Sequence, residues 1–192
     1  MKRSGLIALM TGLLLLAGCT AGDTAENDFG SWQETLRTAQ RVDFEAAVTA
    51  DFGDKTFAYR AALHYADGEA QLCLTEPAIL AGVTLQSADG GVTLAYDGAA
   101  LELGDLTGNG LSPAAALPAV LDALQNGRLL SLARTREEGA EYLMLSLAAR
   151  AGELTVWLER ESLTPVRAEL AEAGRVALVC DISQWHLEGA AA

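Results

Sequence analysis

Apolar and polar residues alternate along most of this chain, a pattern typical of β-strands with one buried face. The alternation runs through residues 44–50 and is clear again over residues 57–65. Three Asp-Gly pairs, at 67–68, 89–90 and 97–98, separate the short apolar runs that follow. Asp-Gly is a strong signal for a two-residue hairpin turn. The first half of the chain therefore predicts an antiparallel meander rather than parallel strands joined by helices.

The second half of the chain repeats this pattern. A first strand is expected at 128–134, and alternating runs follow at 143–147, 154–158, 166–170 and 176–182, separated by turns that contain Gly or Pro. The whole pattern predicts about ten strands. An open, strongly twisted sheet of that many strands tends to curl.

The segment 29–41 has the 3.6-residue period of a helix instead. Trp32, Leu36 and Ala39 share one face of it. Ser31 is a plausible N-cap, because Glu34 follows three residues later as in a capping box.

A second helix is expected at 113–125, where Leu117, Val120, Leu121 and Leu124 form an apolar stripe. Gly127 is expected to end this helix in a left-handed conformation. Because an interior proline breaks a helix, Pro118 is expected at the start of its regular part.

A helix inside a curled sheet buries both the leucine stripe and one face of the strands. We therefore predict an α+β fold, a half-open antiparallel β-barrel with one or two helices capping its concave face. The apolar side chains expected there are Phe57, Tyr59, Leu63, Leu117, Leu121, Leu143, Leu145, Leu147 and Val156. They form either a hydrophobic pocket or an ordinary close-packed core, and the sequence leaves both alternatives open.

The N-terminus has the pattern of a secretory signal. Lys2 and Arg3 precede a short apolar run that ends in Leu16-Ala17-Gly18-Cys19. The run is shorter than the ~20 residues of a spanning helix. A thiol directly after Leu-Ala-Gly resembles a bacterial lipoprotein signal, which implies cleavage before Cys19 and acylation of its thiol. We expect a signal peptide at 1–18, a polar tether at 19–28 and a single domain at 29–192.

The chain is strongly acidic. It has 13 basic and 26 acidic residues, and without the signal's Lys2 and Arg3 the 11 remaining basic residues give a net charge of −15. Such a surface repels nucleic-acid phosphates and anionic lipid headgroups. We therefore expect no nucleic-acid binding, and we expect membrane association to depend on the lipid anchor.

Few residues suggest chemistry. His64 and His186 are the only histidines, and neither has the nearby Cys, Asp or Glu that a metal site needs. Residues 105–110 imitate the start of a calcium loop, but Ala116 stands where the closing Glu belongs. No serine sits in a nucleophile elbow. The sequence predicts no catalytic residue, no metal site and no cofactor, and hence no enzyme.

Two cysteines remain after Cys19. Cys73 and Cys180 each lie in an expected strand, and outside the cytoplasm they could form a disulfide across the sheet. Two buried thiols that act as small apolar residues are the favoured alternative.

These elements together resemble the bacterial lipoprotein-carrier superfamily, which includes LolA-like periplasmic carriers, LolB-like outer-membrane receptors and RseB-like regulators. The similarity lies in the segment 16–19, the N-terminal helix, the strands of 44–74 and 92–96, the helix at 113–125 and the late meander with Leu163-Thr164-Pro165. It covers most of the mature chain as an order of elements, without a short diagnostic motif. The resemblance implies a concave face that holds acyl chains or a lipoprotein's lipid tail.

The predicted function is that of a lipid-anchored, non-enzymatic lipid- or lipoprotein-binding module of the cell envelope, outside the cytoplasm. Its expected partners are a lipid or acyl chain, a lipoprotein or another envelope protein. The alternative is a structural or sensory envelope lipoprotein that binds a protein partner through its acidic surface. A hollow or a filled concave face distinguishes the two hypotheses.

Overall fold

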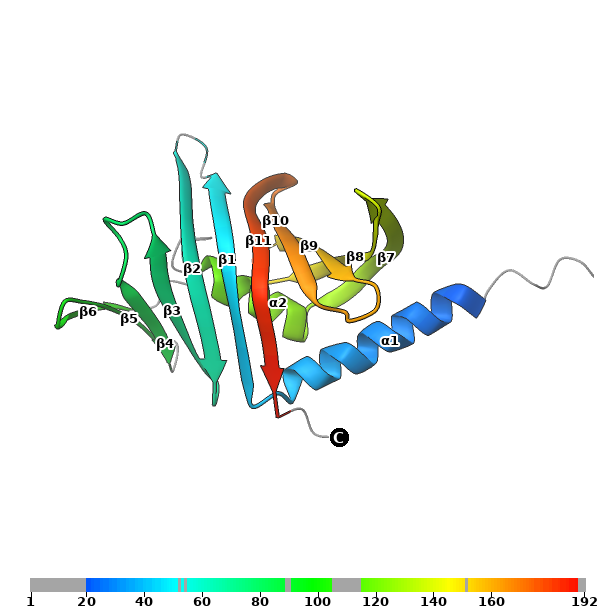
Figure 1. The fold of residues 1–192 in the computed structure, drawn as a ribbon, viewed down its shortest axis with the longest axis horizontal. Coiled ribbons are helices and arrows are strands. Elements are labelled where there is room, and N and C mark those ends of the chain that lie inside the picture. Colours follow the sequence, from blue (N-terminus) through cyan, green and yellow to red (C-terminus); the bar gives the residue numbers. More distant parts are fainter. Residues whose placement is uncertain are drawn as a thin grey trace, which may run out of the picture.

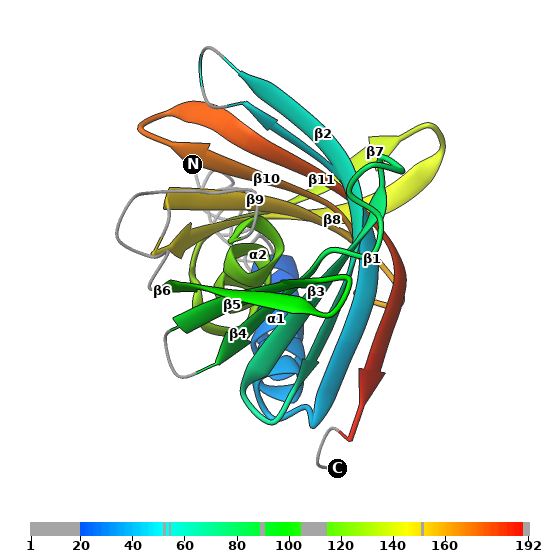
Figure 2. The same cartoon turned by 90° about the vertical axis from the view of Figure 1, so that its left-hand side faces the viewer.

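The computed structural model describes residues 20–51, 53, 55–88, 91–104, 115–150 and 152–189. The expected signal peptide, Cys19, the turn at 89–90, the calcium-like loop at 105–110 and Ser112-Pro113 lie outside these residues. Within them, one antiparallel sheet of 11 strands curls around two helices (Figures 1 and 2). The sheet is not closed into a barrel, so the predicted fold class is confirmed.

Two meanders make up this sheet. The first contains β1 (Arg41–Asp51), β2 (Thr56–Ala66), β3 (Glu69–Glu76), β4 (Thr84–Ala88), β5 (Gly91–Tyr96) and β6 (Ala99–Gly104). The second contains β7 (Arg128–Glu137), β8 (Ala140–Ala149), β9 (Gly152–Glu159), β10 (Pro165–Glu172) and β11 (Arg175–Glu188). They join where β1 pairs with β11, which leaves β6 and β7 as the two edges.

Two-residue turns set the register of the hairpins. Asp67 and Gly68 have φ angles of 53° and 84°, and Asp97 and Gly98 have 48° and 78°. Positive φ at both central residues is the requirement of a type I′ turn, which matches the twist of the flanking strands. The predicted turns at 67–68 and 97–98 are thus confirmed.

A bulge near the end of β11 reverses which residues face the core. Ile182 is buried, and strict alternation would direct residues 184 and 186 inward. Gln184 instead adopts a φ of 54°, and the pairing with β1 shifts by one residue there. Trp185 consequently faces inward and stacks on Phe44 with ring centroids 5.3 Å apart. His186 faces the convex side, opposite Asp43.

Helix α1 (Thr20–Arg37) is longer than the pattern predicts. The residues interpreted as a tether are helical from Thr20, and Ser31 lies inside the helix rather than at its N-cap. Ala25, Phe29 and Leu36 are buried at spacings of four and seven residues, which is one helix face. Glu26, Asn27 and Asp28 are exposed, and this run of polar residues is why the segment resembles a tether in sequence.

Helix α2 (Ala116–Asn126) lies inside the curve of the sheet (Figure 2). The predicted stripe is buried against the strands, with Leu117, Val120 and Leu124 fully covered. Pro118 is the third helical residue rather than the first. In the first turn its missing N–H removes no helical hydrogen bond, so the helix begins at Ala116.

The end of α2 differs from the prediction. Gly127 has φ −64° and ψ 139°, so it is extended instead of left-handed. A Cβ atom there would lie 2.3 Å from the carbonyl oxygen of Ala123 and 3.1 Å from Cβ of Leu147. Glycine is therefore needed for the close approach of β7 to the last turn of α2 and to β8, not for a left-handed cap.

Side chains of α1 bind the free carbonyl groups at the C-terminus of α2. Gln33 donates from Nε2 to the carbonyl oxygens of Leu124 at 3.1 Å and of Gly127 at 2.9 Å. Arg37 donates to the carbonyl oxygen of Gln125 at 3.0 Å. The last carbonyls of a helix have no partner within it, so these bonds fix α1 against α2. Among the described residues, neither helix has the length and apolar character to cross a membrane.

Candidate functional site

The concave face contains most of the residues that the sequence assigns to a hydrophobic pocket. Eight of them are buried in a single apolar cluster: Tyr59, Leu63, Leu117, Leu121, Leu143, Leu145, Leu147 and Val156. Phe57 is 42% exposed near the start of β2. The structure therefore brings these residues together as packed core around α2. This part of the concave face is thus filled, which favours a close-packed core over a pocket among these residues. Lipid binding by the protein stays a prediction.

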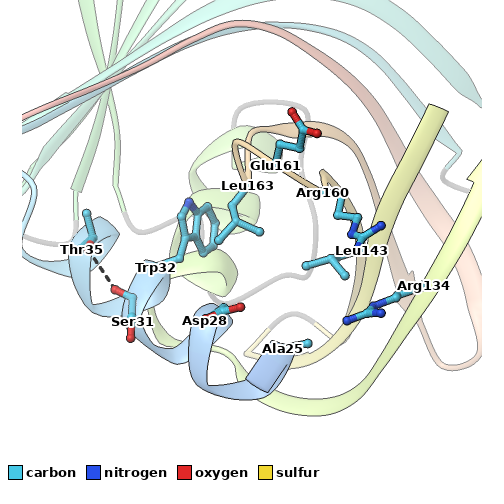
Figure 3. A pocket seen from close by; sticks show the side chains of 10 residues that line it. All are labelled: Ala25, Asp28, Ser31, Trp32, Thr35, Arg134, Leu143, Arg160, Glu161 and Leu163. Carbon is cyan, nitrogen blue, oxygen red and sulfur yellow. Dashed lines mark hydrogen bonds between the residues drawn. The ribbon is translucent and has the colours of Figure 1, made fainter. Parts of the chain in front are cut away.

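A hollow of about 470 Å³ opens beside this core, between α1, β7, β8 and the turn from β9 to β10. It is lined by Ala25, Asp28, Ser31, Trp32, Thr35, Arg134, Leu143, Arg160, Glu161 and Leu163. Figure 3 shows Trp32 and Leu163 on one side of it and Leu143 with both arginines on the other. The lining of the hollow is thus mixed: four apolar side chains share it with four charged side chains and two that carry hydroxyl groups.

Local structure explains why these walls meet. Ala25 and Trp32 lie seven residues apart on the inner face of α1. Leu143 is the first buried residue of β8 and pairs with Arg134 of the edge strand β7. Leu163 has a φ of 54° in the turn between β9 and β10, where its N–H donates to the carbonyl oxygen of Glu159 at 2.9 Å.

The two arginines of the hollow differ in their partners. Arg160 forms an ion pair with Glu141, which also pairs with Arg136 at 2.6 Å. Hydrogen bonds from Arg160 and then Arg136 lower the pKa of the Glu141 carboxyl group below its usual value. Arg134 has no ion pair or side-chain hydrogen bond within the described ranges. Its guanidinium is the cation of this hollow that remains available for a ligand.

Of the residues that line the hollow, the sequence prediction included only Leu143. Two features of the sequence indicate further residues that line the hollow. The helical period of Trp32 extends backwards to Ala25 and includes Asp28 on the same flank of α1. The alternation of β7 continues from Leu132 to Arg134, so an arginine occupies a concave-face position.

Cys73 and Cys180 are free thiols, of which Cys180 is buried and Cys73 only half-buried. Cys180 pairs with the inward-facing Val48, whereas Cys73 follows the inward-facing Leu72 and so lies on the convex side. Strands β2 and β1 also separate them, which places them about 14 Å apart at the ~4.8 Å spacing of paired strands. Burial raises the pKa of the Cys180 thiol to about 12.

The pairing of β1 with β2 and β11 places both histidines next to the carboxylate of Asp43. His64 and His186 are the cross-strand neighbours of Asp43 on the convex face. Nδ1 of His64 is 2.5 Å from Oδ1 of Asp43, and Nε of Arg41 is 2.6 Å from Oδ2. No group of three or more metal-ligating side chains is found in the part of the chain that the structure describes. These histidines belong to a surface network of polar side chains.

No protein-family model matches this sequence, and no curated protein matches it. Solved structures are similar in fold. The match to an outer-membrane lipoprotein-sorting protein domain from Vibrio parahaemolyticus spans 88% of this chain and 95% of that one, with a TM-score of 0.51 and 10% identity. A LolA superfamily protein from Nitrosomonas europaea matches over 85% of this chain and 93% of its own, with a TM-score of 0.45 and 14% identity.

The lipoprotein LppX from Mycobacterium tuberculosis matches over 83% of this chain and 95% of its own, with a TM-score of 0.45 and 12% identity. At identities of 10–14% a structural match shows a similar fold and nothing more. The match to the Vibrio domain, with a TM-score of 0.51, supports the similarity of fold. The molecule therefore shares its half-barrel fold with that domain. The resemblance predicted from the order of elements is confirmed at this level.

Proposed function

We propose that this protein is a membrane-anchored, non-enzymatic module of the cell envelope that binds lipid or the lipid part of a lipoprotein. The observation that supports the proposal is the hollow between α1 and the half-barrel, walled by Trp32, Leu143 and Leu163. Its volume of about 470 Å³ falls in the range of small-molecule sites. The fold shared with a lipoprotein-sorting domain adds to the support.

Binding in such a site needs no bond to be made or broken. Each methylene that leaves water for an apolar wall contributes about 0.8 kcal/mol. Four or five buried methylenes would therefore offset about 3–4 kcal/mol of the cost of immobilising a ligand. The walls supply flat and branched apolar surfaces that accommodate an alkyl chain without requiring one particular shape.

We expect protein purified from membranes to contain extractable acyl lipid, and the delipidated protein to take up a dansyl-labelled fatty acid. Leu163→Asp should weaken uptake at least about tenfold, which corresponds to 1.4 kcal/mol. A carboxylate would then occupy an apolar wall, and aspartate tolerates a positive φ better than leucine does, so the turn itself is not strained. Uptake is measured by dansyl fluorescence and bound lipid by mass spectrometry.

The matched control is Leu101→Asp. Leu101 is 59% exposed on β6, at the opposite end of the sheet from the hollow. This variant should take up the probe as the unchanged protein does. Absence of both extractable lipid and probe uptake would rule out the proposed function.

We expect Cys19→Ala to move the protein from the membrane fraction to the soluble fraction. The proposed anchor is the acylated Cys19 thiol, and two or more acyl chains are needed for stable attachment to a bilayer. Metabolic labelling with palmitate followed by fractionation measures the change. Cys73→Ala is the matched control and should keep both label and membrane attachment. Labelled membrane protein in the Cys19→Ala variant would contradict the proposed anchor.

A further inference from the structure

We infer that the hollow beside α1 selects amphiphiles whose headgroup bears a single negative charge, and that Arg134 is the residue that binds this headgroup. The inference rests on the proposed function, because it names the ligand class of the same site. Its supporting observations are the position of Arg134 on β7, the pairing of the neighbouring arginines, and the charges on the opposite wall.

The inner face of β7 changes from apolar to basic along the strand. Leu129 pairs with Leu147 and Leu132 pairs with Leu145, both of which are buried. The next inward position is Arg134, opposite Leu143. An alkyl chain in contact with Leu143 would therefore bring its polar end to the guanidinium of Arg134.

The other arginines near the hollow are already paired. Glu141 accepts hydrogen bonds from both Arg136 and Arg160. It thus neutralises part of their charge and holds Arg160 at the rim. A guanidinium without a carboxylate partner presents its parallel N–H groups to an incoming carboxylate or phosphate, with which it forms bidentate hydrogen bonds. Arg136 and Arg160 both pair with Glu141. Arg134 has no carboxylate partner among the described residues, so its N–H groups can bind the headgroup of a ligand.

Two carboxylates limit the charge of the ligand. Asp28 projects from α1 on the wall opposite Arg134, and Glu161 directs its carboxylate away from Trp32 and Leu163 (Figure 3). Asp28 and Glu161 thus add two negative charges to a lining in which Arg160 is already paired with Glu141. A second negative charge on the headgroup would meet Asp28 without a further free cation. A carboxylate or a phosphodiester therefore fits this lining better than a dianionic phosphate.

The test compares amphiphiles that share one 14-carbon chain. Myristate and myristoyl-lysophosphatidylglycerol are anionic, and monomyristoylglycerol is neutral. Residues 19–192 with Cys19→Ala contain the whole described fold without the anchor, and they are titrated below the micelle concentration at low salt. Trp32 in the wall reports binding through its fluorescence. We expect both anions to bind at least tenfold more tightly than the neutral lipid, and salt to reduce the difference.

Substitutions separate the headgroup from the chain. Arg134→Gln should remove the preference for the anions while it leaves the affinity for monomyristoylglycerol within twofold. Asp28→Asn should tighten binding of the anions about threefold or more, because it removes a repelling charge from the lining of the hollow. Arg128→Gln, an exposed arginine at the other end of β7, is the matched control and should change neither affinity.

Equal affinities for anionic and neutral lipids in the unchanged protein would overturn the inference, as would an unaltered preference in Arg134→Gln. Either result would leave the proposed lipid binding intact. No binding of any of the three amphiphiles would overturn the proposed function together with the inference.

Discussion

A Leu145→Ala variant is expected to lose about 2–5 kcal/mol of its free energy of unfolding. Leu145 lies at the centre of β8, has no exposed surface and pairs with Val156, which is equally buried. Removing its side chain costs the transfer free energy of the lost carbon atoms and leaves a cavity that the sheet and α2 fill only in part. Because Leu145 does not line the hollow, the lipid affinity of the folded variant should stay within about twofold.

Urea unfolding followed by circular dichroism measures the first quantity, and uptake of the dansyl fatty acid measures the second. Leu101→Ala makes the same chemical change at a residue that is 59% exposed, and it should alter stability by no more than about 0.5 kcal/mol. A Leu145→Ala protein with full stability and lost uptake would show that the leucines of β8 line a ligand cavity rather than a core.

This measurement matters because the sequence alone does not show whether the leucines of β8 form a packed core or line a ligand cavity. The residues predicted for the pocket are apolar, alternate with period two and share the concave face, and this is equally true of a core. The structure shows α2 packed onto them, with Leu117 and Leu121 covered. Periodicity identifies the face that a residue occupies, but it contains no information on how closely the opposite layer approaches that face.

Local chemistry made the overall fold predictable. Asp-Gly pairs dictated the tight turns, and the leucine stripe of α2 required a sheet that curls around it. The extent of α1 was missed for a physical reason. In residues 20–28 only Ala25 has a buried side chain among those the structure describes, so the apolar period begins with a residue as small as alanine. One buried alanine does not distinguish a helix from a polar tether.

The hollow could not be predicted, because it combines three segments that are distant along the chain. Trp32, Arg134 and Leu163 belong to α1, to the edge strand β7 and to the turn after β9. Their meeting depends on the place of α1 relative to the second meander, which the bonds from Gln33 and Arg37 to α2 determine. Side-chain bonds to backbone carbonyls of another helix leave no periodic signal in sequence.

Gly127→Ala is expected to cost at least about 2 kcal/mol of stability and also to weaken lipid binding. The new Cβ would lie 2.3 Å from the carbonyl oxygen of Ala123, a backbone atom that no side-chain rotation can move away. The last turn of α2 or the start of β7 must therefore shift. Gln33 donates to the carbonyl oxygens of Leu124 and Gly127 in this turn, so the shift extends to α1 and to Trp32, the next residue towards the hollow.

Gly30→Ala is the matched control, with an effect of opposite sign. Gly30 is exposed within α1, and a Cβ atom there meets nothing within 4 Å. Alanine in a helix interior is favoured over glycine by about 0.5–1 kcal/mol, so this variant should gain stability and bind lipid unchanged. Unfolding free energies and dansyl uptake of both variants are the measurements. A Gly127→Ala protein as stable as the unchanged one would contradict the close approach at this position.

Gln33→Ala then tests whether Gly127→Ala weakens lipid binding through the hydrogen bonds between Gln33 and the end of α2. Loss of the amide leaves two carbonyl groups at the end of α2 without their partner, and the bonds that position α1 are broken directly. If the shift at Gly127 acts through these bonds, Gln33→Ala weakens lipid uptake by itself. Combining it with Gly127→Ala then adds less than the sum of the two separate effects. Fully additive losses would show that α2 and β7 alter the hollow by a route that does not involve α1.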